Sequence, residues 1–533
     1  MGDGSIEQGQ RIAPSADAVR ADRPGGERSG PALAPPGQAI LVEAAIAATA
    51  GGRGEAADRL NQFLAAPPDE ALKKWLAWSL PPGRRIARDD VVEMLGCQIA
   101  RLDALITDQL NAILHHERFQ KLEASWRGLN YLIDQADDVE NLKVRLLNLA
   151  WKELARDVQR ATEFDQSQLF RKIYSEEFDT PGGEPFGVLI GDYEIHPRAS
   201  AAHPIDDVSV LATVSQVAAA AFAPFIAAAH PSMLELESFQ GLERSLDLPR
   251  TFEQLDYLKW RAFRETEDAR FVGLTLPRVL IRTPYEDDGS RVDGFVFREQ
   301  TGSPDGSGYL WGNAAYALAA VLCRSFDESR WLAGIRGVRR SVDGGGIVPG
   351  LPVHCFGTDR VGVVPKSSTE VLITDPLEQE LSELGFIPLC HCPDTELSVF
   401  YSNSSVQKPK RYDEMAATIN ARISAMLRYM LCVSRFAHYL KIIARDKIGT
   451  FLEASECERF LYDWLHRYVT SDRDASPEVK AEYPLREAAV QVRPHPGKPG
   501  CYLCVAHLWP HFDLDELAGS VKVATELSPG RPG

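Results

Sequence analysis

The residues with the best spacing for metal chemistry lie near the C-terminal end of the sequence. Cys501, Cys504, His507 and His511 are of the types that bind zinc, and they are close together. The segment from Cys501 to Trp509 is, however, predicted as a strand, in which successive side chains alternate between faces. Cys501 and His507 then lie on one face and Cys504 on the other. Tetrahedral coordination would require the strand to break, so we predict no metal site there.

Two further groups have types suited to metal binding or acid–base catalysis. Cys390-His391-Cys392, beside Asp394, falls on alternate faces of a predicted strand end, which favours packing over metal binding. His115 and His116 with Glu117 could transfer protons, but their place between two predicted helices favours a capping or interface role.

Sequence motifs for catalysis are also missing. The chain has no G-x-x-x-x-G-K-[ST] phosphate loop, no H-E-x-x-H and no G-x-S-x-G. The glycines at 344–346 lack the preceding strand and following helix of a dinucleotide loop, so a turn is expected there. We therefore predict no catalytic residues, no cofactor and no metal.

Composition limits the class of protein and its partners. The 533 residues, 44% of them hydrophobic and 25% charged, are enough for several domains of a globular protein. The net charge of −17 argues against nucleic acid as the main partner. No run is long enough for a transmembrane helix and no signal sequence opens the chain, so we expect a cytoplasmic protein without membrane insertion. Nine scattered cysteines do not suggest a disulfide framework.

A short apolar segment, Val188-Leu189-Ile190, is predicted to be the centre of the fold. Glycines and breaker residues bound it, which is typical of a strand buried on both faces. Helical patterns at 98–133 and 206–228 would cover it. Further helices are expected at 252–265, 313–326 and 376–384, and further strands at 277–282, 370–374 and 397–401. The pattern indicates an α/β body with a mixed sheet.

The sequence divides into six regions by composition and periodicity. The first region has almost no large apolar residues and is expected to be disordered; the second carries a short apolar segment with Leu41 and Ile46. The regions are a tail (1–38), an N-terminal helix and linker (39–83), a helical region (84–139), the α/β body (140–410), long C-terminal helices (411–470) and a C-terminal β arm (471–533).

Two long helices stand out by their periodicity. Leu102, Ile106, Leu110 and Ile113 recur at steps of three and four, which places them in one apolar stripe. The same spacing from Met415 onward predicts one continuous helix to about Ile448. The first helix, with the next one from about Glu117, is expected to pack onto another surface.

The C-terminal arm is predicted as a β-hairpin with a third strand near Val521. Val490 and Val492 alternate with polar residues, and a stretch rich in proline and glycine follows. In the next strand Leu503, Val505 and Trp509 share one face. Because an isolated hairpin is marginally stable, the arm must pack on its own core or on another chain.

Six segments resemble the large subunit of the type VI secretion contractile sheath. The resemblance runs in order from about residue 85 to 527, through the segments 120–129, 185–194, 277–280, 309–315, 435–449 and 483–488. It implies a sheath-protein α/β body with N-terminal helices and a C-terminal β-hairpin arm, and a structural role without enzymatic activity. A cytosolic enzyme with an unrecognised site is the alternative. Electron microscopy after co-expression with the small subunit would separate the two, as tubes or as discrete particles.

The resemblance also implies partners and roles for the residues identified above. Large subunits pair with a small sheath subunit, polymerise with neighbouring protomers around an inner tube of hexameric rings, start from a baseplate, and are dismantled by an AAA+ ATPase after contraction. Accordingly, the helical region 84–139 is expected to bind the small subunit, with Leu102, Ile106, Leu110 and Ile113 facing it. Val490, Val492, Leu503, Val505 and Trp509 are expected in an inter-protomer strand arm. Leu41 and Ile46 are expected in the helix that the ATPase recognises.

Overall fold

The computed structural model describes most of the chain after residue 60. The described residues are 61–79, 87–244, 246–287, 289, 294–302, 306–332, 334–338, 344–355, 366–392, 395–447, 454–472, 475–494, 502–511 and 521–527. They form two compact units, Met1–Ile99 and Ala100–Gly533. In the first unit the described elements are α3 (Pro68–Ser79) and the beginning of α4 (Arg88–Leu114). Leu41 and Ile46 lie outside the described residues.

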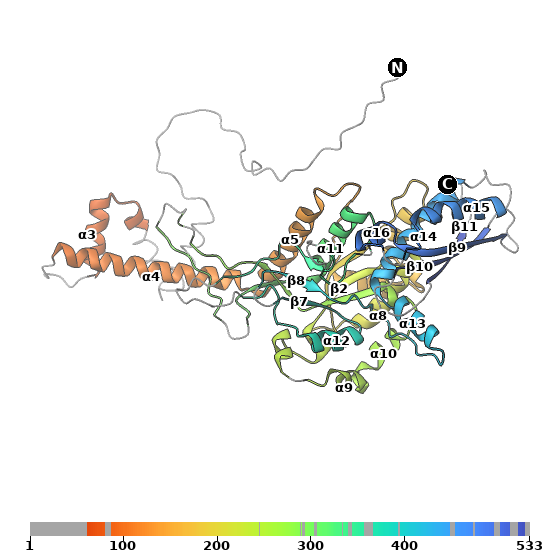
Figure 1. Ribbon diagram of the computed structural model, residues 1–533. Helices are drawn as coiled ribbons and strands as arrows, with labels where there is room; N and C mark the ends of the chain where they lie inside the picture. Colours follow the sequence, from red (N-terminus) through yellow and green to blue (C-terminus); the bar gives the residue numbers. More distant parts are fainter. Residues whose placement is uncertain are drawn as a thin grey trace, which may run out of the picture. The chain divides into compact units, whose positions relative to one another are not determined.

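The second unit is built on a mixed six-stranded sheet (Figure 1). Its order is β1 (Leu189–Ile195), β2 (Phe225–Ala229), β3 (Val272–Leu276), β7 (Ile387–His391), β8 (Ser398–Phe400) and β6 (Ile347–Val348). The first four strands run parallel, and β8 pairs antiparallel with both β7 and β6. The predicted α/β class with a mixed sheet is confirmed.

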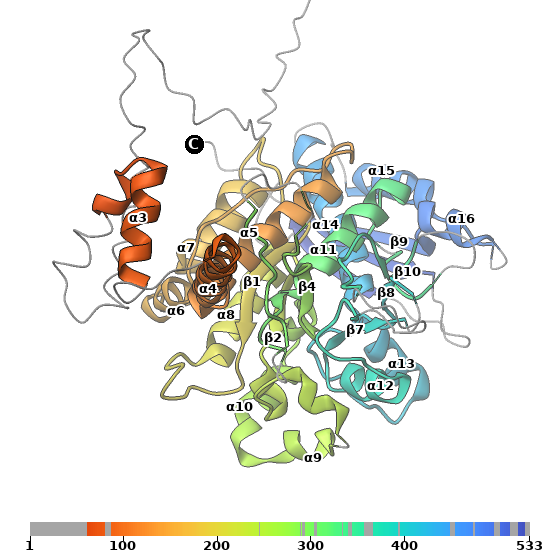
Figure 2. The same cartoon turned by 90° about the vertical axis from the view of Figure 1, so that its left-hand side faces the viewer.

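Helices cover both faces of this sheet because its strands are apolar on both sides. Phe225 and Ala227 pack in a core with residues of α8 (Asp207–Ala221) and α10 (Leu258–Arg264). Ile226, which points to the opposite face, packs with residues of α11 (Ala314–Ser329) and α14 (Leu427–Lys447). Both views place α10 beside α9 (Leu248–Glu253) at one end of the body (Figures 1 and 2).

The remaining elements surround this layered body. Apart from short 3-10 helices, the remaining described elements are a two-stranded ladder of β4 and β5, eight helices and a three-stranded sheet. They are α5 (Glu117–Ala136), α6 (Trp151–Arg160), α7 (Gln168–Phe170), the π-helix η2 (Arg171–Phe178), β4 (Val279–Arg282), β5 (Leu310–Gly312), α12 (Asp375–Glu383), α13 (Met415–Ser424), α15 (Ala454–Leu465), α16 (Pro477–Glu482), β9 (Leu485–Pro494), β10 (Tyr502–Pro510) and β11 (Val521–Leu527). None of the described helices is both long and apolar enough to cross a membrane.

Three expectations about the centre of the fold are wrong. The strand after Val188 is β1, which lies at the edge of the sheet, and β2 and β3 are among the central strands. The helix expected over 206–228 ends at Ala221, because Phe222 adopts a left-handed conformation (φ 51°). The chain then turns at Pro224 and forms β2. The helical region 98–133 does not cover the sheet: α5 packs on α11 instead.

Two further elements differ from the expected ones. Residues 370–374 form no strand; the chain there is held beside β4 by the isolated bridge between Val279 and Thr369. The helix expected from Met415 to about Ile448 is split into α13 and α14. The break occurs because Ser405 N donates to Ala425 O (2.9 Å) and Leu427 N donates to Asn403 O (2.8 Å). The backbone at Ala425–Leu427 therefore pairs with a neighbouring segment.

Candidate functional site

The C-terminal sheet, which consists of β9, β10 and β11, has β10 as its central strand. β10 pairs antiparallel with β9, for example Val505 opposite Gln491, and antiparallel with β11, with Val505 opposite Ala524. The hairpin expected from the sequence is therefore part of a three-stranded sheet. Since both sides of β10 already pair within the chain, any strand added by a neighbour would have to pair at β9 or β11.

The inner face of the C-terminal sheet packs on the chain's own core. Cys504, Ala506 and Leu508 are buried against residues of α14 and α15, with Phe436 and Leu461 at the centre. Val492 is buried in the same cluster and Val490 is packed against it. Val492 N also donates a hydrogen bond to Glu458 Oε2 of α15 (2.8 Å). The arm therefore rests on its own core through one face.

The outer face of the sheet carries the other alternating side chains of β10. Leu503 is exposed, and Val505, His507 and Trp509 are half-buried. The predicted arm residues thus divide, with Val490 and Val492 on the inner face and Leu503, Val505 and Trp509 on the outer face. Cys504 and His507 also lie on opposite faces, as the alternation predicts, while Cys501 lies outside the described residues.

The apolar stripe of α4 is largely uncovered. Leu102 is 57% exposed, Ile106 and Ile113 are also exposed, and Leu110 is half-buried. The helix is fixed by a different side: buried Asn111 donates from Nδ2 to Thr107 O (2.9 Å) and accepts from Gln300 N (3.0 Å). The chain therefore presents the predicted residues on a surface of the second unit.

A second apolar stripe lies on α5, which the sequence predicted to pack with α4 onto another surface without identifying the residues. Phe119, Leu122, Trp126 and Ile133 are all exposed, and Trp126 is exposed to 61%. Their spacing of three, four and seven residues is the same helical periodicity that identified the α4 stripe, so the sequence alone could have identified this stripe. The chain after α5 adds more exposed apolar side chains, namely Val144, Leu146 and Leu147.

The opposite side of α5 packs closely on α11. Gly128 and Leu132 are its buried residues. A Cβ atom at Gly128 would lie 2.5 Å from Tyr316 Cδ2, so the two helices can approach this closely only because position 128 has no side chain. The packing fixes which face of α5 remains outside.

A buried ion network anchors α5 to β4. Arg282 bonds Glu299 through Nη1 (2.5 Å) and Nη2 (3.1 Å), and its Nε bonds Glu123 Oε1 of α5 (2.9 Å). Glu299 also accepts from Tyr285 N (2.9 Å) and lies 3.2 Å from His115 Nε2. Burial acts to raise the pKa of Glu299, but the hydrogen bonds from Arg282 and Tyr285 lower it overall. The carboxylate is thus held ionised.

A second ion pair joins two of the six resembling segments. Arg278 bonds Glu194 of β1 through Nε (2.6 Å) and Nη2 (2.9 Å). Burial would raise the pKa of Glu194, yet these bonds lower it. Asn313, from a third segment, caps α11 by accepting from Ala315 N (2.8 Å) and donates to Gly191 O (3.3 Å). These segments therefore hold the body together.

The cysteine and histidine residues considered above for metal binding or acid–base catalysis make contacts that stabilise the fold. His391 is buried in β7 with Nδ1 3.2 Å from Ser398 Oγ, and burial lowers its pKa. Burial likewise raises the pKa of the Cys390 thiol to about 12, which keeps it protonated. His116 caps α5 by accepting from Arg118 N (3.3 Å). These contacts explain the three residues without catalysis.

The comparisons with known proteins all point to the same protein family. Residues 97–407 match the family described as EvpB/VC_A0108, tail sheath N-terminal domain, and residues 416–527 match its tail sheath gpW/gp25-like domain. A curated relative from Pseudomonas aeruginosa, named type VI secretion system sheath protein TssC1, is 42% identical over 442 residues. That similarity covers 82% of this chain and 87% of the relative.

Proposed function

The chain belongs to the family of type VI secretion contractile-sheath large subunits, and on that premise we propose how it assembles. It pairs with a small sheath subunit in the bacterial cytoplasm and polymerises with copies of the same pair around an inner tube of hexameric rings. Contraction of this sheath, which starts from a baseplate, drives effectors out of the cell. The observation that supports pairing best is the uncovered apolar stripe of α5, together with that of α4.

The two stripes have the character of a protein-binding surface. Phe119, Leu122 and Trp126 combine aromatic and aliphatic groups, the side chains that dominate the centres of interfaces. Contiguous exposed apolar area on a folded protein marks an association site. The glycine contact with Tyr316 and the bonds of Arg282 hold α5 rigidly, so little ordering entropy opposes binding. We assign the small subunit to this surface.

The C-terminal sheet is suited to contacts between protomers. Its inner face is committed to its own core, whereas Leu503, Val505 and Trp509 form an outer face available to a neighbour. Addition of a strand from a neighbour would occur at the edges of β9 or β11, where backbone groups can extend the ladder. Val490 and Val492 contribute indirectly, by fixing the sheet on α14 and α15.

This assembly requires no bond-breaking chemistry in the subunit. Contraction uses free energy stored in interfaces at assembly, so a mechanical role explains the chain without an active site. An AAA+ ATPase then recycles contracted sheaths, and residues 38–48 with Leu41 and Ile46 are the proposed segment that it recognises. Pull-down of the ATPase by contracted sheaths tests that assignment: replacing both residues with Asp should weaken capture and leave assembly unchanged.

Co-expression with the small subunit tests the pairing surface. Leu122→Lys and Trp126→Lys should each abolish co-purification of the small subunit and tube formation in electron micrographs, because each places a charge in the apolar stripe. Gln254→Lys is the control: it adds the same charge at an exposed position outside α4 and α5, beside Glu235 Oε2 (3.4 Å), and should leave tubes intact. Normal tubes from both stripe variants would refute the assignment.

A further inference from the structure

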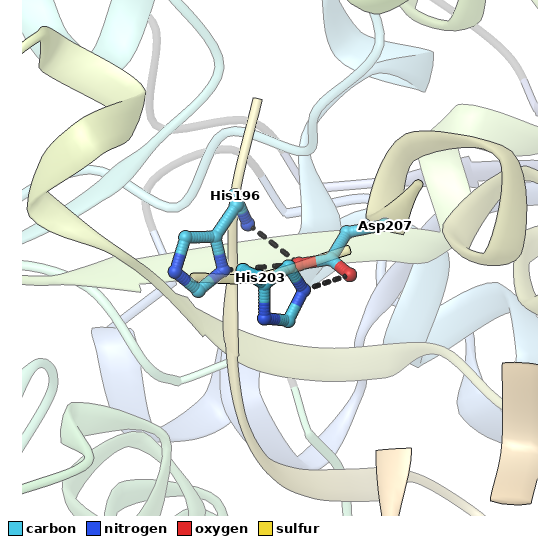
Figure 3. A group of neighbouring side chains, drawn as sticks. All are labelled: His196, His203 and Asp207. Carbon is cyan, nitrogen blue, oxygen red and sulfur yellow. Dashed lines mark hydrogen bonds and ion pairs between the residues drawn. The ribbon is translucent and has the colours of Figure 1, made fainter. Parts of the chain in front are cut away.

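A cluster of imidazoles and one carboxylate lies at the carboxyl end of the parallel strands. His196 directly follows β1, His230 directly follows β2, and Asp207 begins α8. Figure 3 shows the side chains of His196 and His203 converging on Asp207. In open α/β sheets, the carboxyl ends of parallel strands are the usual place for a bound ligand. The function proposed above gives this cluster no role.

Asp207 is a fully buried carboxylate whose basic neighbours are imidazoles. Its side chain is 0% exposed. It accepts four hydrogen bonds: Trp151 Nε1 (2.6 Å) and His203 Nε2 (2.7 Å) at Oδ1, and His196 N (2.9 Å) and His196 Nδ1 (3.1 Å) at Oδ2. Four donors require the ionised form, which is acceptor-only. Over the described part of the chain, no lysine or arginine lies within ion-pairing distance of it.

A buried charge of this kind calls for a compensating cation. Buried carboxylates in proteins are paired with a cation or bind a metal ion. The two imidazoles touching Asp207 are stacked on each other, with ring centroids 4.1 Å apart, and His196 is stacked on His230 as well (4.0 Å). Protonation of several stacked rings would bring like charges into contact. One divalent ion between the rings and the carboxylate supplies positive charge without that repulsion.

The distances suit a small transition-metal ion. One ligand atom from each of His196, His203 and Asp207 lies within 4.8 Å of the others. Tetrahedral zinc holds nitrogen and oxygen ligands at about 2.0–2.2 Å, which places them roughly 3.3 Å apart. The observed 2.7 and 3.1 Å between the nitrogens and the carboxylate oxygens need only a slight widening. Because His203 Nε2 and His196 Nδ1 carry the protons in the metal-free chain, each neutral imidazole takes its other tautomer on binding, with the proton on the second ring nitrogen, so that these two nitrogens can coordinate the ion. His196 and His203 are 20% and 24% exposed, so an ion and a water molecule can enter.

We propose that His196, His203 and Asp207 bind one zinc-type divalent ion, with a water molecule as the fourth ligand. Imidazole nitrogens select zinc, cobalt, nickel or copper over magnesium and calcium. The Trp151 N–H fixes the orientation of the carboxylate, as outer-shell hydrogen bonds do in known metal sites. His230 is directed elsewhere, because its Nδ1 is bonded to Ser232 (2.8 Å). The ion would tie the loop between β1 and α8 to the start of α8.

Cobalt(II) is the direct probe, because a tetrahedral site gives it a strong visible absorption band and zinc displaces it. The full chain, co-purified with its small subunit and stripped of metal, should bind one cobalt ion, and zinc should raise its melting temperature, since an ion that binds only the folded state stabilises it. His203→Ala and His196→Ala should each weaken binding more than 100-fold, beyond the 10–100-fold typical of outer-shell changes.

Controls separate a lost ligand from a lost fold. His507→Ala removes a half-buried histidine from the outer face of β10 and should bind cobalt as the unmodified chain does. The circular dichroism of each metal-free variant should match that of the metal-free parent. Absence of the cobalt band in the parent, or an affinity of His196→Ala and His203→Ala equal to that of the parent, would overturn the proposal and leave a cluster held by hydrogen bonds alone.

Discussion

Replacing Arg282 with methionine tests whether the buried ion network holds α5 in place. Arg282 and Glu299 are only 6% and 1% exposed, and the substitution removes the arginine that bonds the Glu299 carboxylate and leaves His115 Nε2 beside it (3.2 Å). Breaking a buried pair by removing one partner costs about 3–5 kcal/mol, because the other charge stays uncompensated. Since 1.4 kcal/mol is a factor of ten, the unfolded fraction should rise by roughly two to three and a half orders of magnitude.

The assay is denaturant unfolding of the chain co-purified with its small subunit. The midpoint should fall strongly in Arg282→Met. Arg127→Met is the matched control, because Arg127 bonds the same Glu123 (2.7 Å) but is 42% exposed. An exposed pair contributes about 0.3–0.5 kcal/mol, so this variant should unfold almost as the parent does. The double variant Arg282→Met/Glu299→Leu should recover most of the loss, because no buried charge is left unpaired.

The same network predicts a pH dependence with a defined sign. The pKa of Glu299 is lowered in the folded chain, so its stabilisation is present above its unfolded pKa, about 4.3. That contribution is lost as the pH falls through the folded pKa. The parent should therefore lose stability in this acid range more steeply than Arg282→Met. A free energy of unfolding for Arg282→Met within about 1 kcal/mol of that of the parent, at neutral pH, would refute the reasoning.

Other predictions concern packing and thiol access. Gly128→Ala should lower stability by about 1–3 kcal/mol, because its Cβ would overlap the Tyr316 ring, and thermal melts should detect this. Leu508→Ala, which leaves a cavity between the C-terminal sheet and α14, should cost about 2–5 kcal/mol in denaturant unfolding. A disulfide reagent should modify exposed Cys97 quickly and spare Cys432 until unfolding, since burial raises the Cys432 pKa to about 12.

Periodicity predicted the surfaces better than the centre of the fold. The three- and four-residue steps identified the α4 stripe, and alternation placed Leu503, Val505 and Trp509 on one face, since both patterns are local. Strand β2 was missed because Phe225–Ala229 is a short apolar run rich in alanine, which period alone cannot separate from the end of a helix. The signal that remained was Pro224, just before it. The break at Ala425–Leu427 depends on pairing with Asn403 and Ser405, which no local pattern reports.

The histidine cluster shows a different limit. His203 and Asp207 are four residues apart at the start of a helix, and His196 and His203 each precede a proline, so a partial signal existed. His230 and Trp151 come from elsewhere in the chain, and only the parallel pairing of β1 with β2 brings His230 beside His196. A site whose residues come from the ends of different strands can be predicted only when the order of the strands in the sheet is known.

The strand order of the main sheet has a consequence for synthesis on the ribosome. β3 pairs with β7, which is made long after it, and the face formed by Ile226 is covered by Leu427 and Leu431 of α14. The nascent chain therefore leaves the part of this face that α14 covers exposed, together with the apolar stripe of α5, until residues beyond 431 have emerged. Such long-range closure is slow, and it leaves apolar surface open to aggregation. The body accordingly folds late in translation, and a chaperone or an early encounter with the small subunit would protect it in that interval.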